Sequence, residues 1–227
     1  MNLKRFLFFI LGLAAFLPVA GLAQTAEPIP VISWKARSYA PAEFQGKPLP
    51  ISNTPILASL EVFAGGKKAD ISNYRIYWYL NDRLIDRGVG LQSVSVRAPQ
   101  LLNGGVVSLR AKIDDYPGFQ ISKNINIPIT TPGAAIKRSS AGDKFFSKTL
   151  EFEAVPYFFN VTDIPSLSFS WKVNGESVSA AENPQKLIVT INDDAASGAM
   201  LNVEALISNP MEYFEFAKAQ KSLTFSK

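Results

Sequence analysis

The sequence contains no cysteine and no histidine. The first absence excludes disulfide bonds, thiolate metal ligands and a cysteine nucleophile, and the second removes the commonest general base, a common zinc ligand and the usual pH switch. Hydrophobic residues make up 47% of the 227 residues and charged residues only 19%, which excludes a disordered chain and allows a buried core. We therefore expect a folded protein that is not an enzyme and that holds no cofactor and no metal.

The remaining acidic clusters do not change that expectation. Asp114-Asp115 and Asp193-Asp194 are adjacent pairs that we predict to lie in turns, where aspartate accepts local backbone hydrogen bonds. A structural calcium ion near Asn192-Asp193-Asp194 stays an alternative, although no EF-hand spacing is present.

The first residues have the layout of an export signal. Lys4-Arg5 is followed by the apolar run Phe6–Leu17, and Gly21-Leu22-Ala23 places small residues at a cleavage position. We predict a signal peptide over residues 1–23 and an exported protein of the extracellular space or cell envelope. The alternative is an uncleaved anchor, since Phe6–Ala23 is wholly apolar but is only at the lower limit for spanning a bilayer. Contact with a membrane is expected only through this segment.

The rest of the chain contains an internal duplication, in which two halves align with an offset of 93 to 95 residues. Asp70-Ile71 precedes Trp78 by the same spacing as Asp163-Ile164 precedes Trp171, and Gly104–Ile113 matches Gly198–Ile207. Asn81-Asp82 matches Asn174-Gly175 directly after the tryptophan segments. We place one domain at residues 24–130 and the second at residues 131–227.

Apolar residues alternate with polar ones inside each unit, which predicts strands rather than helices. Six short strands separated by turns in about 100 residues indicate an all-β chain of two tandem immunoglobulin-like β-sandwiches. Trp78 and Trp171 are expected as buried core residues of the third strand in each. The expected strands are Val31–Arg37, Ile56–Phe63, Tyr74–Leu80, Leu91–Val96, Val106–Ile113, Ile121–Ile129, Ala134–Arg138, Leu150–Val155, Leu167–Val173, Leu187–Ile191, Met200–Ile207 and Phe214–Phe225.

The segments Tyr77–Asp82 and Ser170–Gly175 carry a resemblance to a known class. The chain resembles the tandem Ig-like or PKD-like β-sandwich repeats of bacterial secreted and cell-surface proteins. Neither unit has the Gly-Asp-Gly that usually follows the tryptophan strand of PKD repeats, which favours the broader Ig-like class. The resemblance implies a module for display, spacing or adhesion. It also makes the glycosylation acceptor pattern Asn160-Val161-Thr162 inert, because that pattern matters only in a eukaryotic secretory path.

The two units differ in charge and in one predicted surface. Residues 24–130 have a net charge of +4 and residues 131–227 of −2, too little basic density for nucleic-acid binding. Alternation places five side chains on one outer sheet face of the first unit, and Tyr with Arg is typical of binding hot spots. We predict that this face binds an acidic or carbohydrate partner; the alternative is an ordinary solvated face with cross-strand Tyr–Arg pairs. The five residues are Arg75, Tyr77, Tyr79, Arg110 and Lys112.

The second unit has consecutive aromatic residues that cannot all point inward. They are Phe145-Phe146, Tyr157-Phe158-Phe159 and Tyr213-Phe214 with Phe216. Either they pack between the domains or they form a protein-contact patch.

Together the features of the sequence predict a non-catalytic structural or adhesive module of the cell envelope that binds an envelope protein or a surface polysaccharide. The alternative function is an accessory subunit of a larger surface assembly.

Overall fold

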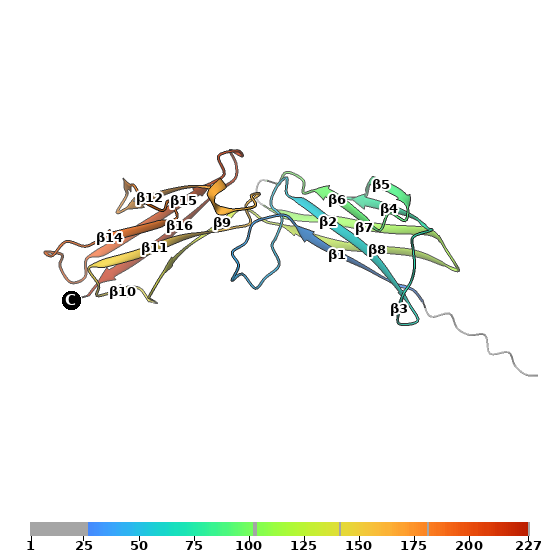
Figure 1. The fold of residues 1–227 in the computed structure, drawn as a ribbon, viewed down its shortest axis with the longest axis horizontal. Helices are drawn as coiled ribbons and strands as arrows, with labels where there is room; N and C mark the ends of the chain where they lie inside the picture. The colour runs from blue at the N-terminus through green and yellow to red at the C-terminus, as the bar shows by residue number, and fades with distance from the viewer. Residues whose placement is uncertain (1–26, 102–103, 141, 181, 227) are drawn as a thin grey trace, which may run out of the picture.

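A computed structural model describes residues 27–101, 104–140, 142–180 and 182–226 of the chain. These residues form two β-sandwiches that lie end to end (Figure 1). The predicted all-β, Ig-like fold is confirmed. The predicted signal peptide, residues 1–23, lies outside the described residues. In the part of the chain that is described, no helix has the length and apolar character needed to cross a membrane.

The N-terminal sandwich packs a sheet of order β6-β2-β1, with the short β3 also paired to β2, against a sheet of order β5-β4-β7-β8. All pairings in both sheets are antiparallel. The bounds of the strands are β1 Ile29–Ala36, β2 Pro55–Ala64, β3 Lys67–Lys68, β4 Arg75–Leu80, β5 Arg83–Val89, β6 Ser93–Arg97, β7 Gly105–Tyr116 and β8 Phe119–Ile129.

The C-terminal sandwich packs a sheet of order β14-β11-β9 against one of order β10-β16-β15-β12-β13. Its strands are β9 Gly133–Arg138, β10 Lys144–Phe145, β11 Thr149–Tyr157, β12 Ser168–Val173, β13 Glu176–Val178, β14 Lys186–Thr190, β15 Met200–Ser208 and β16 Phe216–Phe225, with a 3-10 turn at Ile164–Ser166. The first strand of this sandwich changes sheet: β9 pairs with β11, and β10 pairs in parallel with β16.

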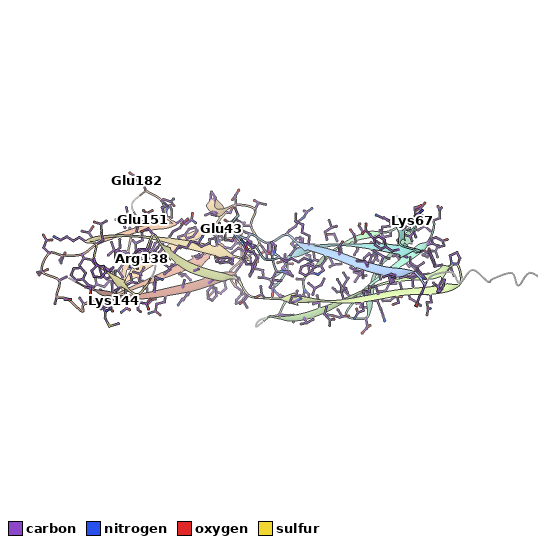
Figure 2. The ribbon with its side chains drawn as sticks, turned by 90° about the horizontal axis from the view of Figure 1, so that it is seen from below. Glu43, Lys67, Arg138, Lys144, Glu151 and Glu182 are labelled. Atoms are coloured by element: carbon purple, nitrogen blue, oxygen red, sulfur yellow. The ribbon has the colours of Figure 1, made fainter. Side chains whose placement is uncertain are left out.

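Arg138 stabilises this change of sheet. Its guanidinium donates hydrogen bonds to the carbonyl oxygens of Ser140, Gly142 and Lys144, at 2.9, 2.9 and 3.3 Å. Figure 2 shows Arg138 and Lys144 near each other on the C-terminal sandwich, well away from Lys67 at the far end of the N-terminal one. One side chain thus satisfies three carbonyl groups of a segment that leaves one sheet before it joins the other.

Each sandwich has its own hydrophobic core, one between Ile32 and Ile129 and the other between Phe145 and Phe225. Trp78 and Trp171 are buried in them, as predicted. Their indole Nε1 groups donate 2.9 Å hydrogen bonds to the carbonyls of Leu91 and Pro184, and each acceptor lies 13 residues beyond its tryptophan. The duplicated spacing in the sequence therefore corresponds to a duplicated hydrogen bond.

The turn after each tryptophan strand is also repeated. Asn81 and Asn174 have positive φ angles of 47° and 51°, which asparagine tolerates better than most residues. The side-chain oxygen of Asn81 accepts a bond from the Ser108 amide, and that of Asn174 accepts one from the Asn202 amide, at 3.0 and 2.9 Å. Each asparagine thereby fixes the end of its strand against the neighbouring strand of the sheet.

Every strand expected from the sequence overlaps an observed strand, but the short strands β3, β10 and β13 were not predicted, and the sequence reading was also wrong in the following details. Asp114-Asp115 lies within β7 rather than in a turn, because β7 and β8 continue past a register shift between Ile113 and Tyr116. The last strand begins at Phe216, since Asn209–Glu215 forms hydrogen-bonded turns before it. Strand β5 was not predicted, because its residues are nearly all exposed and do not alternate.

Candidate functional site

The five residues of the predicted binding surface lie on adjacent strands. Tyr77 lies opposite Lys112 and Tyr79 opposite Arg110 in the β4–β7 register, while Trp78 between them pairs with Ala111 on the buried side. Arg75 is exposed on the same side of β4. We call this set, Arg75, Tyr77, Tyr79, Arg110 and Lys112, the Arg/Tyr face.

Arg110 is the central cation of the Arg/Tyr face. Its guanidinium carbon lies 4.7 Å from the centre of the Tyr79 ring, and its Nη2 lies 3.1 Å from the Asp82 carboxylate. Its Nε is buried and has no hydrogen-bond acceptor among the described residues. The guanidinium therefore lies over the Tyr79 ring in a cation–π contact while its Nη2 pairs with the Asp82 carboxylate.

Lys112 has a carboxylate neighbour on its own strand. Its Nζ lies 2.6 Å from an Asp114 oxygen, and this hydrogen bond raises the pKa of Lys112 and lowers the pKa of Asp114. Both side chains are partly exposed, so the pair contributes little to stability and can be exchanged for contacts with a ligand.

The structure adds residues that sequence reasoning missed. Strand β5 brings Arg87 directly opposite Tyr77, and β8 brings Ser122 and Asn124 opposite Lys112 and Arg110. Arg87 was missed because β5 itself was not predicted. The extended face runs over four strands and combines cations, phenol rings and neutral hydrogen-bonding groups.

The equivalent face of the C-terminal sandwich has a different chemistry. The pairs that correspond to Tyr79–Arg110 and Tyr77–Lys112 are Lys172–Glu204 and Ser170–Leu206. No tyrosine lies on these two strands, and a lysine and a glutamate face each other. The duplicated framework therefore carries the Arg/Tyr face only on its N-terminal copy.

A second notable region lies where the two sandwiches meet. Thr54 Oγ1 donates a 2.6 Å hydrogen bond to Asn160 Oδ1, and Asn160 Nδ2 donates a 3.0 Å bond to the Ser52 carbonyl. Both atoms of one side-chain amide of the C-terminal sandwich thus bind the loop that precedes β2. Asn160 is also the first residue of the glycosylation pattern Asn160-Val161-Thr162. Its Nδ2 is used in a contact within the protein.

Backbone and ring contacts extend this junction. Tyr39 and Phe159 form an isolated antiparallel bridge, in which the Tyr39 amide donates to the Phe159 carbonyl at 2.7 Å. The Phe44 ring meets the rings of Tyr157 and Phe158 edge-on, with centroids 5.9 and 5.4 Å apart. Lys137 forms an ion pair with Glu43, and Figure 2 shows Glu43 near the junction. Interdomain packing is therefore confirmed for the rings of Tyr157 and Phe158, whereas the Phe159 side chain is buried in the core of the C-terminal sandwich and only its backbone takes part in the junction.

Glu215 is a buried carboxylate in this junction. It is only 5% exposed and accepts a hydrogen bond from the backbone amide of Asn160. Burial raises the pKa of Glu215, and the nearby Glu212 charge acts in the same direction, while hydrogen bonds with Asn160 and Asn209 oppose the shift. The burial effect is the largest of these, so the neutral form is favoured relative to a solvated glutamate.

A cavity of about 220 Å³ opens beside Glu215 between the two sandwiches. Its wall comes from the loops around residues 51–53 and 100–101, the linker at residues 130–132, Asn160 and the turn at residues 212–215. Phe214 lies on this wall and is 75% exposed. Sequence periodicity gave no sign of this cavity, because it is assembled from loops that are distant in the sequence.

The turn between β15 and β16 holds the most exposed aromatic residues of the protein's described part. Tyr213 is 88% exposed, and its ring meets that of Phe214 edge-on at 5.1 Å. This turn projects from the C-terminal sandwich next to the junction (Figure 1). Tyr213, Phe214 and Phe216 are therefore largely exposed rather than buried between the sandwiches, and Phe214 lies on the wall of the cavity there. Among the described residues, no group of acidic side chains is arranged to hold a metal ion.

No protein-family model and no curated protein matches this sequence. Its fold is similar to solved structures of low sequence identity. The fibronectin(III)-like modules of CbhA from Clostridium thermocellum are 12% identical with a TM-score of 0.33, and the match covers 87% of this chain and 93% of that one.

Two further structures are similar at the same level. Three N-terminal domains of the outer capsid protein Hoc of bacteriophage RB49 are 10% identical, with a TM-score of 0.42 and coverage of 88% of this chain and 59% of that one. Mouse CEACAM1b is 11% identical, with a TM-score of 0.31 and coverage of 86% and 100%. At such identities the ligands of these proteins say nothing about those of this chain.

Proposed function

We propose that the chain is a non-catalytic, exported binding module of the cell envelope, of the kind found in bacterial surface proteins, and that its Arg/Tyr face attaches to a carboxylate-rich partner. The observation that carries this proposal is the partly exposed Arg110 guanidinium, which lies over the Tyr79 ring and directs its Nη2 to the highly exposed Asp82 carboxylate, a position that a ligand carboxylate can take. A carboxylate that reaches this guanidinium gains a charge-assisted hydrogen bond.

The surroundings of Arg110 fit such a ligand. Arg75, Arg87 and Lys112 supply further cations within the same face, and Asp82 and Asp114 are exposed partners that a ligand carboxylate can replace. The tyrosine rings give contact area at low entropic cost. The sandwich supplies a rigid support, because every second residue of β4 and β7 is anchored in the core.

The test is a binding measurement of the purified protein with two carboxylate polymers, polygalacturonate and polyglutamate. We expect both to bind more weakly as ionic strength rises. The double variant Arg75→Ala/Arg110→Ala is expected to lower affinity by about tenfold or more, since each lost charge contact is worth roughly 1 kcal/mol or more. The matched control is Lys172→Ala/Lys218→Ala, which removes two cations from the outer face of the C-terminal sandwich. Equal affinity of the two double variants would refute the role of the Arg/Tyr face.

A second function, as an accessory subunit of a larger surface assembly, is favoured by strand β5. This strand lies at the edge of its sheet and exposes Leu84, Ile85 and Val89, by 42, 36 and 60%. An exposed apolar edge can add a strand from a neighbouring subunit. Sedimentation over a range of protein concentrations tests this function. Oligomers that disappear in Val89→Lys would support it, and a monomer at all concentrations would exclude self-assembly through β5.

A further inference from the structure

We propose that the cavity at the junction of the two sandwiches is a second binding site, and that it takes one neutral sugar unit of a glycan chain. This site is distinct from the Arg/Tyr face in place, in lining and in the charge of its ligand. It lies between the sandwiches, where ligand sites of multidomain proteins commonly occur.

The size of the cavity limits the ligand. About 220 Å³ is less than the roughly 300 Å³ at which sites for drug-sized molecules begin. A single six-membered sugar ring fits this space, while the adjoining units of a glycan remain outside in solvent. The cavity therefore binds one sugar unit of a glycan and leaves the rest of the glycan in solvent.

The lining excludes anions. No lysine or arginine side chain lies on the described wall, whereas Glu212 and Glu215 both do. A phosphate, sulfate or uronate group would meet repulsion there without a compensating cation. Acidic polymers are therefore ligands for the Arg/Tyr face and not for the cavity.

The lining also disfavours a cation. Glu215 is buried and already accepts a hydrogen bond from the Asn160 amide, so it is poorly placed to offset the desolvation of an ammonium or guanidinium group. Neutral hydrogen-bonding groups dominate instead, with Asn53, Gln100 and Thr131 on the wall. Amides, hydroxyls and a carboxyl can each donate to or accept from sugar hydroxyl groups, which both donate and accept.

Phe214 supplies the remaining element of a sugar site. Its ring is 75% exposed, lies on the cavity wall and meets the Tyr213 ring edge-on. The exposure of a large aromatic ring to water is unfavourable, and a partner that covers the ring removes this cost. The C–H face of a sugar ring is apolar and flat enough to cover Phe214, while the hydroxyl groups around its rim reach the polar wall.

The site is preformed by the junction contacts. Asn160 joins the two sides of the cavity through its hydrogen bonds with Thr54 and Ser52, and Glu215 holds Asn160 in place from within the C-terminal sandwich. Binding therefore needs little ordering of the protein, which favours affinity for a small ligand.

The test is titration of the purified full protein with tetrasaccharides of glucose, mannose, galactose and N-acetylglucosamine, followed by calorimetry and by NMR of side-chain amides. We expect at least one of them to bind, and we expect Phe214→Ala and Gln100→Ala each to weaken that binding by about 3- to 10-fold. The control is Phe146→Ala, which removes an equally exposed ring, 72% against 75%, far from the cavity in the C-terminal sandwich. Both wall residues are exposed, and circular dichroism verifies that each variant is folded.

Three outcomes would overturn the proposal. They are no binding of any of the four tetrasaccharides, binding that Phe214→Ala and Gln100→Ala leave unchanged, and stronger binding of tetralysine that these two variants abolish. The double variant Arg75→Ala/Arg110→Ala separates this site from the Arg/Tyr face, because it should leave tetrasaccharide affinity unchanged. Loss of polygalacturonate binding with retained tetrasaccharide binding in this double variant assigns polygalacturonate to the Arg/Tyr face. The reverse result in Phe214→Ala assigns the tetrasaccharide to the cavity.

Discussion

Thr54 and Asn160 are 106 residues apart in the sequence, and their side chains share a 2.6 Å hydrogen bond across the junction of the two sandwiches. Thr54 is fully buried, and its hydroxyl also accepts a bond from the Ile51 amide at 2.9 Å. Asn160 completes this arrangement through its bond to the Ser52 carbonyl. This polar pair thus holds Asn160 of the C-terminal sandwich against the loop that precedes β2 in the N-terminal sandwich.

Replacing Asn160 with alanine should destabilise the junction by about 1–3 kcal/mol, because the Thr54 hydroxyl and the Ser52 carbonyl lose their partner while partly or fully buried. Chemical denaturation measures the change in unfolding free energy. The control is Asn124→Ala, which removes an exposed acceptor of the Ser108 hydroxyl and should change stability by less than about 0.5 kcal/mol. Indistinguishable denaturation midpoints of the two variants would show that the junction bond contributes nothing.

Glu215→Gln should change the pH dependence of stability. Burial raises the pKa of Glu215 in the folded protein above its ordinary value of 4.5, so protonation favours the folded state. The stabilising contribution of the protonated acid is complete below pH 4.5 and is lost as pH rises through the folded pKa. Thermal unfolding of the wild type should therefore move upward relative to Glu215→Gln as pH falls toward 4.5. Parallel pH profiles of the two proteins would contradict this prediction, and Asp70 and Asp114 cancel from the comparison because both proteins contain them.

Trp78→Phe and Trp171→Phe should each destabilise the protein by about 2–4 kcal/mol, since each leaves a void and removes the donor to a partly buried carbonyl. Calorimetric unfolding measures both. Trp34→Phe is the matched control, because this partly exposed ring lies under Lys47 and belongs to the edge of the core, so its loss should cost less than about 1.5 kcal/mol. A Trp34 variant as unstable as the other two would indicate that ring size alone sets the effect.

Asn81→Ala should cost about 1–2 kcal/mol, because alanine is strained at a φ of 47° and lacks the oxygen that accepts from the Ser108 amide. Asn81→Gly keeps the accessible backbone angle and loses only the hydrogen bond, so it should be the less destabilised of the two. Denaturant unfolding of both variants gives the order. If glycine proved worse than alanine, backbone strain would not be the reason for asparagine at this turn.

Much of the fold was predictable because it depends on local alternation. The run Ile76, Trp78 faces inward on β4 because a two-residue period separates core from solvent along a strand, and the same rule placed the Arg/Tyr face. Strand β5 escaped because an edge strand with exposed residues on both sides has no period to detect.

The junction could not be predicted from the sequence for a different physical reason. Asn160, Glu215 and Thr54 are single polar residues outside the strands, and their roles arise from contacts between segments that are about 50 to more than 100 residues apart. Phe214 was expected at the start of the last strand because it continues the aromatic run, but the turns from Asn209 to Glu215 keep it outside the sheet. The sequence contained these residues without any periodicity to show which would meet.

The bridge between Tyr39 and Phe159 has a mechanical consequence. The described residues begin at one end of the molecule and finish at the other, so tension applied at both ends runs along β1 and β16 (Figure 1). The β1–β2 ladder is then loaded in shear, with its bonds resisting together, whereas the junction contacts are pulled apart head-on. Under load the two sandwiches should separate first around the linker at residues 130–132. The molecule would lengthen slightly, with both cores intact, before either sandwich unfolds.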